Sequence, residues 1–139
     1  MKLLEGKRAL VTGVANRWSI ATGIARALHQ HGASLAFIYQ GERVKDEVEK
    51  LAGELGGGPA WPCDVSSEDD LRKLAEAVRA ELGSLDALVH SIAYVNKEDL
   101  AGKVYDTSRA GFSLALDISS YSLIALVAAL RETLSDGAS

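Results

Sequence analysis

Short apolar runs alternate with amphipathic helical stretches along this chain, and this alternation constrains its fold more than any other feature. The runs cover residues 8–12, 34–39 and 60–63, and each is dominated by apolar side chains. Runs of this length are typical of strands buried on both faces. Strands and helices at this spacing predict βαβ units around a parallel sheet. We therefore expect an α/β fold, a Rossmann-like three-layer α/β/α arrangement.

The segments between and after these runs carry apolar residues at helical spacing. A serine at residue 19 is the expected cap of the first helix, and a glycine at residue 32 closes it. The predicted helices span residues 19–29 and 42–55, and a third opens at residues 64–66. A fourth strand is predicted over residues 85–92, a loop over 96–107 and a last helix over 108–134.

Composition narrows the class of protein. The chain has 139 residues, with 19 acidic and 15 basic side chains, which is the size and balance of one soluble domain over residues 1–139. The absence of a basic cluster argues against a nucleic-acid partner. Cys63 is the only cysteine, so neither a disulfide framework nor a metal site is predicted. Charges at Glu5, Lys7 and Arg8 interrupt any secretory signal, which favours a cytoplasmic location.

The last predicted helix is unusually apolar. Residues 112–130 approach the length of a membrane span, but Asp117 and several serines would be costly in lipid. We therefore predict a buried helix and no membrane partner. Because its apolar residues lie on more than one face, one stripe can cover the sheet while the rest needs another partner. This predicts a homo-oligomer formed through residues 108–134.

One strand-to-helix turn has the layout of a dinucleotide site. Such a site needs a strand, a tight turn and a helix N-terminus whose free N–H groups meet the pyrophosphate. Residues 12–21 have this order, although only Gly13 of the usual three glycines is present. An ordinary turn capped by Ser19 is the alternative.

Three more segments stand at the carboxyl ends of the other predicted strands, the edge where open α/β sheets bind ligands. Gln40 could bond the adenosine ribose, and Asp64 could accept from the adenine amino group beside the apolar wall of Val65. The fourth strand ends near the pyrophosphate and nicotinamide ribose with Ser91, Ile92 and Ala93. Each has a plain alternative: a solvated loop residue, a cap of the third helix, or a simple strand end. Their common edge favours the cofactor.

The spacing of one turn and four further ordered blocks resemble a known family. The spacing Gly13-x5-Ser19-Ile20-Ala21 is similar to the first turn of bacterial enoyl-acyl-carrier-protein reductases, a divergent branch of the short-chain dehydrogenase/reductases. The further blocks that resemble this family are residues 36–40, 63–65, 89–93 and 116–123. The similarity covers essentially the whole chain.

The resemblance implies an NADH-dependent reductase of fatty-acid biosynthesis. In that family, hydride from NADH reaches the β-carbon of a trans-2-enoyl thioester carried by acyl carrier protein. A tyrosine hydroxyl stabilises the resulting enolate, and a lysine holds the nicotinamide ribose. A non-catalytic dinucleotide-binding module and a generic short-chain carbonyl reductase are the alternatives, and the unusual first turn disfavours the second.

The family's site residues carry over to matching positions. Those expected at the pyrophosphate and nicotinamide ribose are Gly13, Ser19 and Ile20, and those expected at the adenosine are Gln40, Asp64 and Val65. Beneath the cofactor would pass Ser91, Ile92 and Ala93. The start of the family's substrate and inhibitor loop matches Tyr94 and Val95, which replace its usual phenylalanine and alanine.

Charge at the end of the second strand decides between the two nicotinamide cofactors. A 2′-phosphate needs an arginine or lysine there, whereas this chain has Gln40, Gly41 and Glu42. NADH is therefore favoured, with NADPH left open by the nearby Arg43 and Lys45.

The family's catalytic pair is a tyrosine and a lysine separated by six residues, after a fifth strand. No tyrosine here has a lysine at that spacing, so no catalytic residue is assigned. Residues 135–139 form a turn where the resemblance calls for strand five, which would leave strand four as an exposed apolar edge. We expect the amino-terminal half of a longer enzyme, truncated before the fifth strand.

Overall fold

The structure, a computed structural model, describes residues 2–139 and contains one parallel sheet. The strands lie in the order β3-β2-β1-β4, and all three pairings are parallel. The strands are β1 (Arg8–Val11), β2 (Ser34–Tyr39), β3 (Ala60–Pro62) and β4 (Ala87–Val89).

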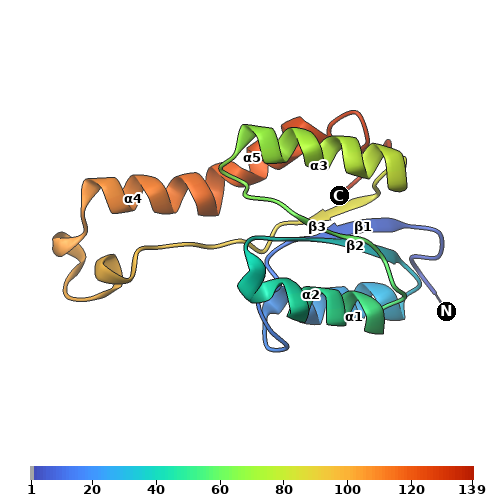
Figure 1. The fold of residues 1–139 in the computed structure, drawn as a ribbon, viewed down its shortest axis with the longest axis horizontal. Helices are drawn as coiled ribbons and strands as arrows, with labels where there is room; N and C mark the ends of the chain where they lie inside the picture. Colours follow the sequence, from blue (N-terminus) through green and yellow to red (C-terminus); the bar gives the residue numbers. More distant parts are fainter. Residues whose placement is uncertain (1) are drawn as a thin grey trace.

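Helices cover both faces of this sheet (Figure 1). The helices on one face are α1 (Ile20–Gln30) and α2 (Glu42–Glu54), and those on the other are α3 (Glu68–Glu81) and α5 (Ser122–Leu130). Successive strand residues point to opposite faces, so Val11 and Phe37 pack with α1 and α2 while Leu10 and Ile38 pack with α3 and α5. The predicted three-layer α/β fold is confirmed.

The predicted ends of several helices and strands are wrong where long-range contacts determine them. The fourth strand is limited to Ala87–Val89 rather than residues 85–92, because His90 leaves the sheet and its ring bonds Ser122 on the neighbouring helix. Ser19 does stand before α1, but its hydroxyl makes no cap bond and accepts instead from the preceding turn. The α3 helix starts at residue 68, where its cap is Ser67 rather than Asp64.

The predicted helix over residues 108–134 is divided. It consists of α4 (Arg109–Leu116), a π-helical turn η3 (Asp117–Tyr121) and α5, which ends at Leu130. The preceding loop contains two short 3₁₀ turns, η1 (Lys97–Leu100) and η2 (Val104–Asp106). Together the loop and α4 form an arm that stands away from the sheet (Figure 1).

Burial along this helix is uneven. The buried residues of α5 form one stripe, Ser122, Leu126 and Leu130, while α4 buries only Gly111. The stretch from Arg109 to Leu130 is long and apolar enough to cross a membrane, and only 17% of its most apolar window is buried. The prediction of a buried helix is therefore right for one stripe of α5 and wrong for α4, which leaves the sheet at the π-turn.

The outer edge of β4 is covered along part of its length. Leu134 forms a parallel bridge with Leu85, and the Leu88 N–H donates to the Ser139 carbonyl at 2.9 Å. In return, the Ser139 N–H donates to the Asp86 carbonyl at 3.0 Å. The prediction of an exposed edge is wrong here, because the last residues of the chain run beside the strand.

The stripe of α5 generates a prediction about stability. Leu126 is fully buried, so Leu126→Ala is expected to lower the free energy of unfolding by about 2–5 kcal/mol. Leu123→Ala, on the exposed side of the same helix, should cost about 1 kcal/mol or less. Urea titration followed by circular dichroism measures both, and equal losses would contradict the described packing of α5.

Candidate functional site

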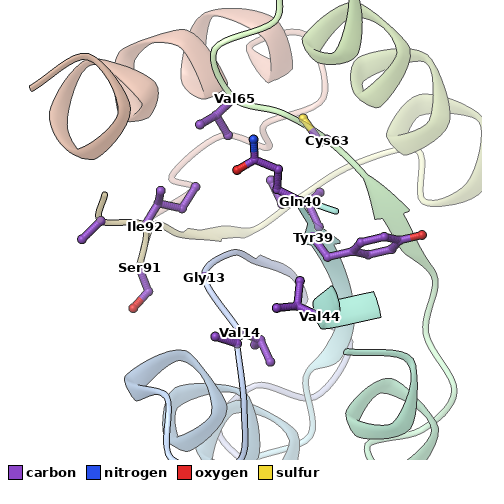
Figure 2. Close-up of a pocket in the computed structure, with 12 residues that line it drawn as sticks. Gly13, Val14, Tyr39, Gln40, Val44, Cys63, Val65, Ser91 and Ile92 are labelled. Carbon is purple, nitrogen blue, oxygen red and sulfur yellow. The ribbon is translucent and has the colours of Figure 1, made fainter. Parts of the chain in front are cut away.

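A cleft of about 210 Å³ lies at the carboxyl ends of β1, β2 and β4 (Figure 2). Its walls come from the first turn, the β2 and β3 ends and the segment after β4. The lining includes these predicted cofactor residues: Gly13, Gln40, Val65, Ser91, Ile92 and Ala93. Three other predicted residues do not line it: Ser19, Ile20 and Asp64. The structure thus brings most of the predicted set together at one edge.

Gly13 is where the first turn meets the segment after β4. Its φ of +85° favours glycine, and a Cβ at this position would overlap the backbone carbonyl of Ser91. Thr12 ties the same two segments together, because its buried hydroxyl donates to the Val89 carbonyl at 2.8 Å and accepts from the Ser91 N–H at 3.2 Å. Sequence reasoning missed Thr12, whose one signal was a hydroxyl at the end of an apolar run.

The rest of the first turn is held by hydroxyl groups. Ser19 Oγ accepts from the N–H groups of Ala15 (3.0 Å) and Asn16 (3.1 Å), and Thr22 Oγ1 donates to the Asn16 carbonyl at 2.8 Å. Within residues 2–139, no acceptor meets the N–H groups of Ile20 and Ala21 at the start of α1. A free helix N-terminus of this kind attracts anions.

The ends of β2 and β3 lie side by side at the cleft, where the Cys63 N–H donates to the Tyr39 carbonyl at 2.8 Å. The amide of Gln40 lies toward Val65 (Figure 2). Asp64 Oδ1 accepts from the Ser66 N–H at 2.9 Å and from its hydroxyl at 2.6 Å. These bonds from Ser66, with a smaller contribution from Gln40, lower the pKa of Asp64, which is therefore an anion at neutral pH. The arrangement presents a fixed hydrogen-bond acceptor beside an apolar wall.

Apolar side chains make up much of the lining, and several escaped sequence reasoning. Val14 and Val44 lie on one side of the cleft, and Val65 and Ile92 on the other (Figure 2). Val44 belongs to the α2 stripe, so nothing in the sequence marks it as a cleft residue. Cys63 also lines the cleft; burial above all, then Asp70 and Asp64, raises the pKa of its thiol to about 12. A neutral thiol of this kind is a packing group rather than a nucleophile.

The residues predicted to contact substrate stand beyond the cleft. Tyr94 and Val95 are largely exposed at the start of the arm and do not line the cavity. Ser119 holds the Tyr94 backbone at both groups, since its Oγ accepts from the N–H at 2.9 Å and donates to the carbonyl at 3.1 Å. Among residues 2–139, no three His, Cys, Asp or Glu side chains are placed to hold a metal ion.

Comparison with known protein families finds one match that spans most of the chain. The family described as enoyl-(acyl carrier protein) reductase matches residues 13–139. Among curated relatives, the NADH-dependent enoyl-acyl-carrier-protein reductase FabI of Aquifex aeolicus is 52% identical over 126 residues, covering 91% of this chain and 47% of the relative. FabI of Bacillus subtilis is 44% identical over 138 residues, covering 98% of this chain and 54% of the relative.

Solved structures agree with these relatives. The Aquifex aeolicus NADH reductase superposes with a TM-score of 0.93 at 50% identity, over 96% of this chain and 52% of that one. The Bacillus cereus enzyme, solved with NADP⁺ and indole naphthyridinone, gives a TM-score of 0.93 at 43% identity, over 98% of this chain and 54% of that one. The chain spans about half the length of the relatives it matches.

Because Gly13 contacts Ser91, we predict that alanine substitution destabilises the protein much more at Gly13 than at a glycine in open space. Gly13→Ala is expected to lower the free energy of unfolding by about 2–5 kcal/mol. Alanine is strained at this left-handed φ, and its Cβ would also displace the Ser91 backbone. Gly57 has a similar φ of +74° but open space around it, so Gly57→Ala should cost only about 1–2 kcal/mol. Chemical denaturation of both variants checks this, and equal costs would mean that the close approach is absent.

Proposed function

Because this chain belongs to the enoyl-(acyl carrier protein) reductase family, we propose that it forms the cofactor-binding part of an NADH-dependent reductase of fatty-acid biosynthesis. The substrate would be a trans-2-enoyl thioester carried by acyl carrier protein. The observation that carries the proposal is the cleft, which gathers Gly13, Gln40 and Ser91. Its lining residue Ala15 is bonded to Ser19, directly before the free N-terminus of α1.

The residues at this edge fit a dinucleotide. The free N–H groups of Ile20 and Ala21 would meet the pyrophosphate, and Gly13 lines the cleft at the turn that precedes them. At the other end, Gln40 would bond the adenosine ribose. Asp64 offers an acceptor to the adenine amino group, since only part of its capacity is used by Ser66.

The chemistry divides between the cofactor and the protein. When bound, the nicotinamide supplies the hydride that the β-carbon of the substrate accepts. The segment Ser91–Ala93 would form the floor that orients it, and the apolar wall of Ile92 would exclude water from the reacting atoms. The charge that develops on the thioester oxygen needs a donor, and this chain contains no tyrosine and lysine at the family's spacing.

We favour NADH over NADPH on electrostatic grounds. The β2 strand is followed by Gln40, Gly41 and Glu42, and one of the two nearby cations, Lys45, faces the Glu42 carboxylate at 3.7 Å. A 2′-phosphate at the strand end would meet an amide and then a carboxylate, with Arg43 as the nearby cation outside any ion pair in the described part of the chain. The NADP⁺ in the Bacillus cereus structure keeps NADPH as the alternative.

We propose that the protein is a homo-oligomer in the cytoplasm, and the exposed face of α4 and α5 supports the homo-oligomer. Large apolar side chains gather along this helical stretch, namely Phe112, Leu114, Leu116, Tyr121, Leu123, Ile124 and Val127. An exposed apolar surface of this kind marks an interaction site, and most soluble oligomers are symmetric assemblies of one chain. Because Asp117 would be costly in lipid, a second copy is the better partner for this face.

Enzyme assays test the proposal on the full gene product that carries this sequence. We expect oxidation of NADH, followed by its absorbance, on addition of a trans-2-enoyl thioester of acyl carrier protein. Gln40→Arg should shift the ratio of kcat/KM for NADPH to that for NADH by about tenfold or more, because an arginine can pair with the 2′-phosphate. The matched control is Gln30→Arg, which adds the same charge at the far end of α1.

Wild-type protein that binds NADH without turning over an enoyl thioester would favour the non-catalytic module. If Gln40→Arg and Gln30→Arg shift the preference for NADPH over NADH equally, the place assigned to the adenosine is contradicted.

Sedimentation velocity tests the oligomer. We expect the wild type to sediment as a multimer at micromolar concentration and Ile124→Glu to shift it toward the monomer, because a charge enters an apolar interface. Leu3→Glu places the same charge at a similarly exposed apolar residue outside the helix and should leave the sedimentation coefficient unchanged. A monomeric wild type would overturn the assignment.

A further inference from the structure

The π-turn η3 between α4 and α5 has a specific hydrogen-bond arrangement. The Ser122 N–H donates to the Asp117 carbonyl, five residues back, instead of the Ile118 carbonyl that an α-helix would use. The Ser122 hydroxyl donates to that carbonyl at 2.6 Å. The side chain thus replaces the amide as the donor to Ile118, which satisfies the backbone group that the π-turn would otherwise leave open.

This arrangement determines how Ser122 meets His90. Their atoms, Ser122 Oγ and His90 Nε2, lie 2.8 Å apart, and Ser122 is almost fully buried. A hydroxyl has one proton, and here Ile118 takes it, so Ser122 Oγ accepts from an Nε2–H of His90. The imidazole is therefore held in one orientation, directly before Ser91 in the cleft floor.

A second serine of the same turn holds the other end of that segment. Ser119 Oγ contacts both the N–H and the carbonyl of Tyr94, at 2.9 and 3.1 Å. Residues 90–94 lie outside every strand, so they lack ladder bonds to fix them. Besides the Thr12 bond to Ser91 and the bond from the Tyr94 hydroxyl to Asn96 Oδ1, the two serines of the π-turn supply the side-chain hydrogen bonds described for this segment.

We propose that Ser119 and Ser122 are positioning residues for the reaction, with Ser122 setting the cofactor end of the 90–94 segment and Ser119 its substrate end. The inference rests on the proposed function. The π-turn places both hydroxyls against the segment, so the helix that carries the exposed apolar face also holds the floor of the cleft. Neither serine touches the reacting atoms; each acts through the backbone or ring it fixes.

Steady-state kinetics on the full gene product separate the two roles. Ser119→Ala is expected to raise the KM for the enoyl thioester by about 3- to 10-fold, the range for one or two lost hydrogen bonds, with kcat and the KM for NADH within about 2-fold. Ser119→Thr keeps a hydroxyl and should restore the KM. Ser120→Ala removes a neighbouring exposed hydroxyl with no described partner and should change neither constant.

Ser122→Ala should give the opposite pattern, a higher KM for NADH by about 3- to 10-fold, because His90 loses its acceptor next to the cofactor floor. The Ser119 comparison decides the proposal even where Ser122→Ala fails to fold. An active wild type in which Ser119→Ala behaves like Ser120→Ala overturns this inference alone. A wild type without reductase activity overturns the proposed function and this inference with it.

Discussion

The close approach of two backbones holds the site together. The turn that leaves β1 at Gly13 passes directly against Ser91 after β4, and Thr12 bonds both Val89 and Ser91 just before that crossing. Only a residue without a Cβ permits this approach, and only a short polar side chain one position earlier can link both segments. The first turn, the cleft floor and the free start of α1 all take their places from this contact.

The part of the chain around the sheet and the arm beyond it differ sharply in how they bury apolar side chains. Around the sheet, α1 and α2 bury one apolar core and α3 and α5 bury another on the opposite face. Beyond the π-turn, α4 and its loop leave the sheet and expose large apolar side chains such as Phe112 and Leu116. The layers around the sheet build the cleft, while the apolar side chains of α4 stay exposed.

Sequence reasoning succeeded where local patterns decide the structure. Apolar runs such as residues 34–39 became strands, and the edge shared by Gly13, Gln40, Val65 and Ser91 follows from the rule that parallel strands end on one side. The overall fold and half of the cleft lining could thus be predicted from local pattern and strand direction.

Sequence reasoning failed where a side chain or backbone group bonds a partner other than the one that the local pattern predicts. The Ser19 hydroxyl bonds the preceding turn rather than the helix it precedes. His90 leaves β4 for a serine 32 positions away, and the π-turn around residue 119 has no distinct signature in an apolar helical pattern. The edge of β4 pairs with the backbone of Ser139, and a backbone pairing of this kind leaves no side-chain pattern in the sequence.

A crystal structure of the full gene product with NADH bound would show directly whether the dinucleotide occupies the cleft. We expect the pyrophosphate at the N-terminus of α1, near Gly13, and the adenine ring against Val65, between Gln40 and Asp64. A dinucleotide bound instead in the polar hollow between α1 and α2, where Arg26 and Lys50 lie, would contradict it.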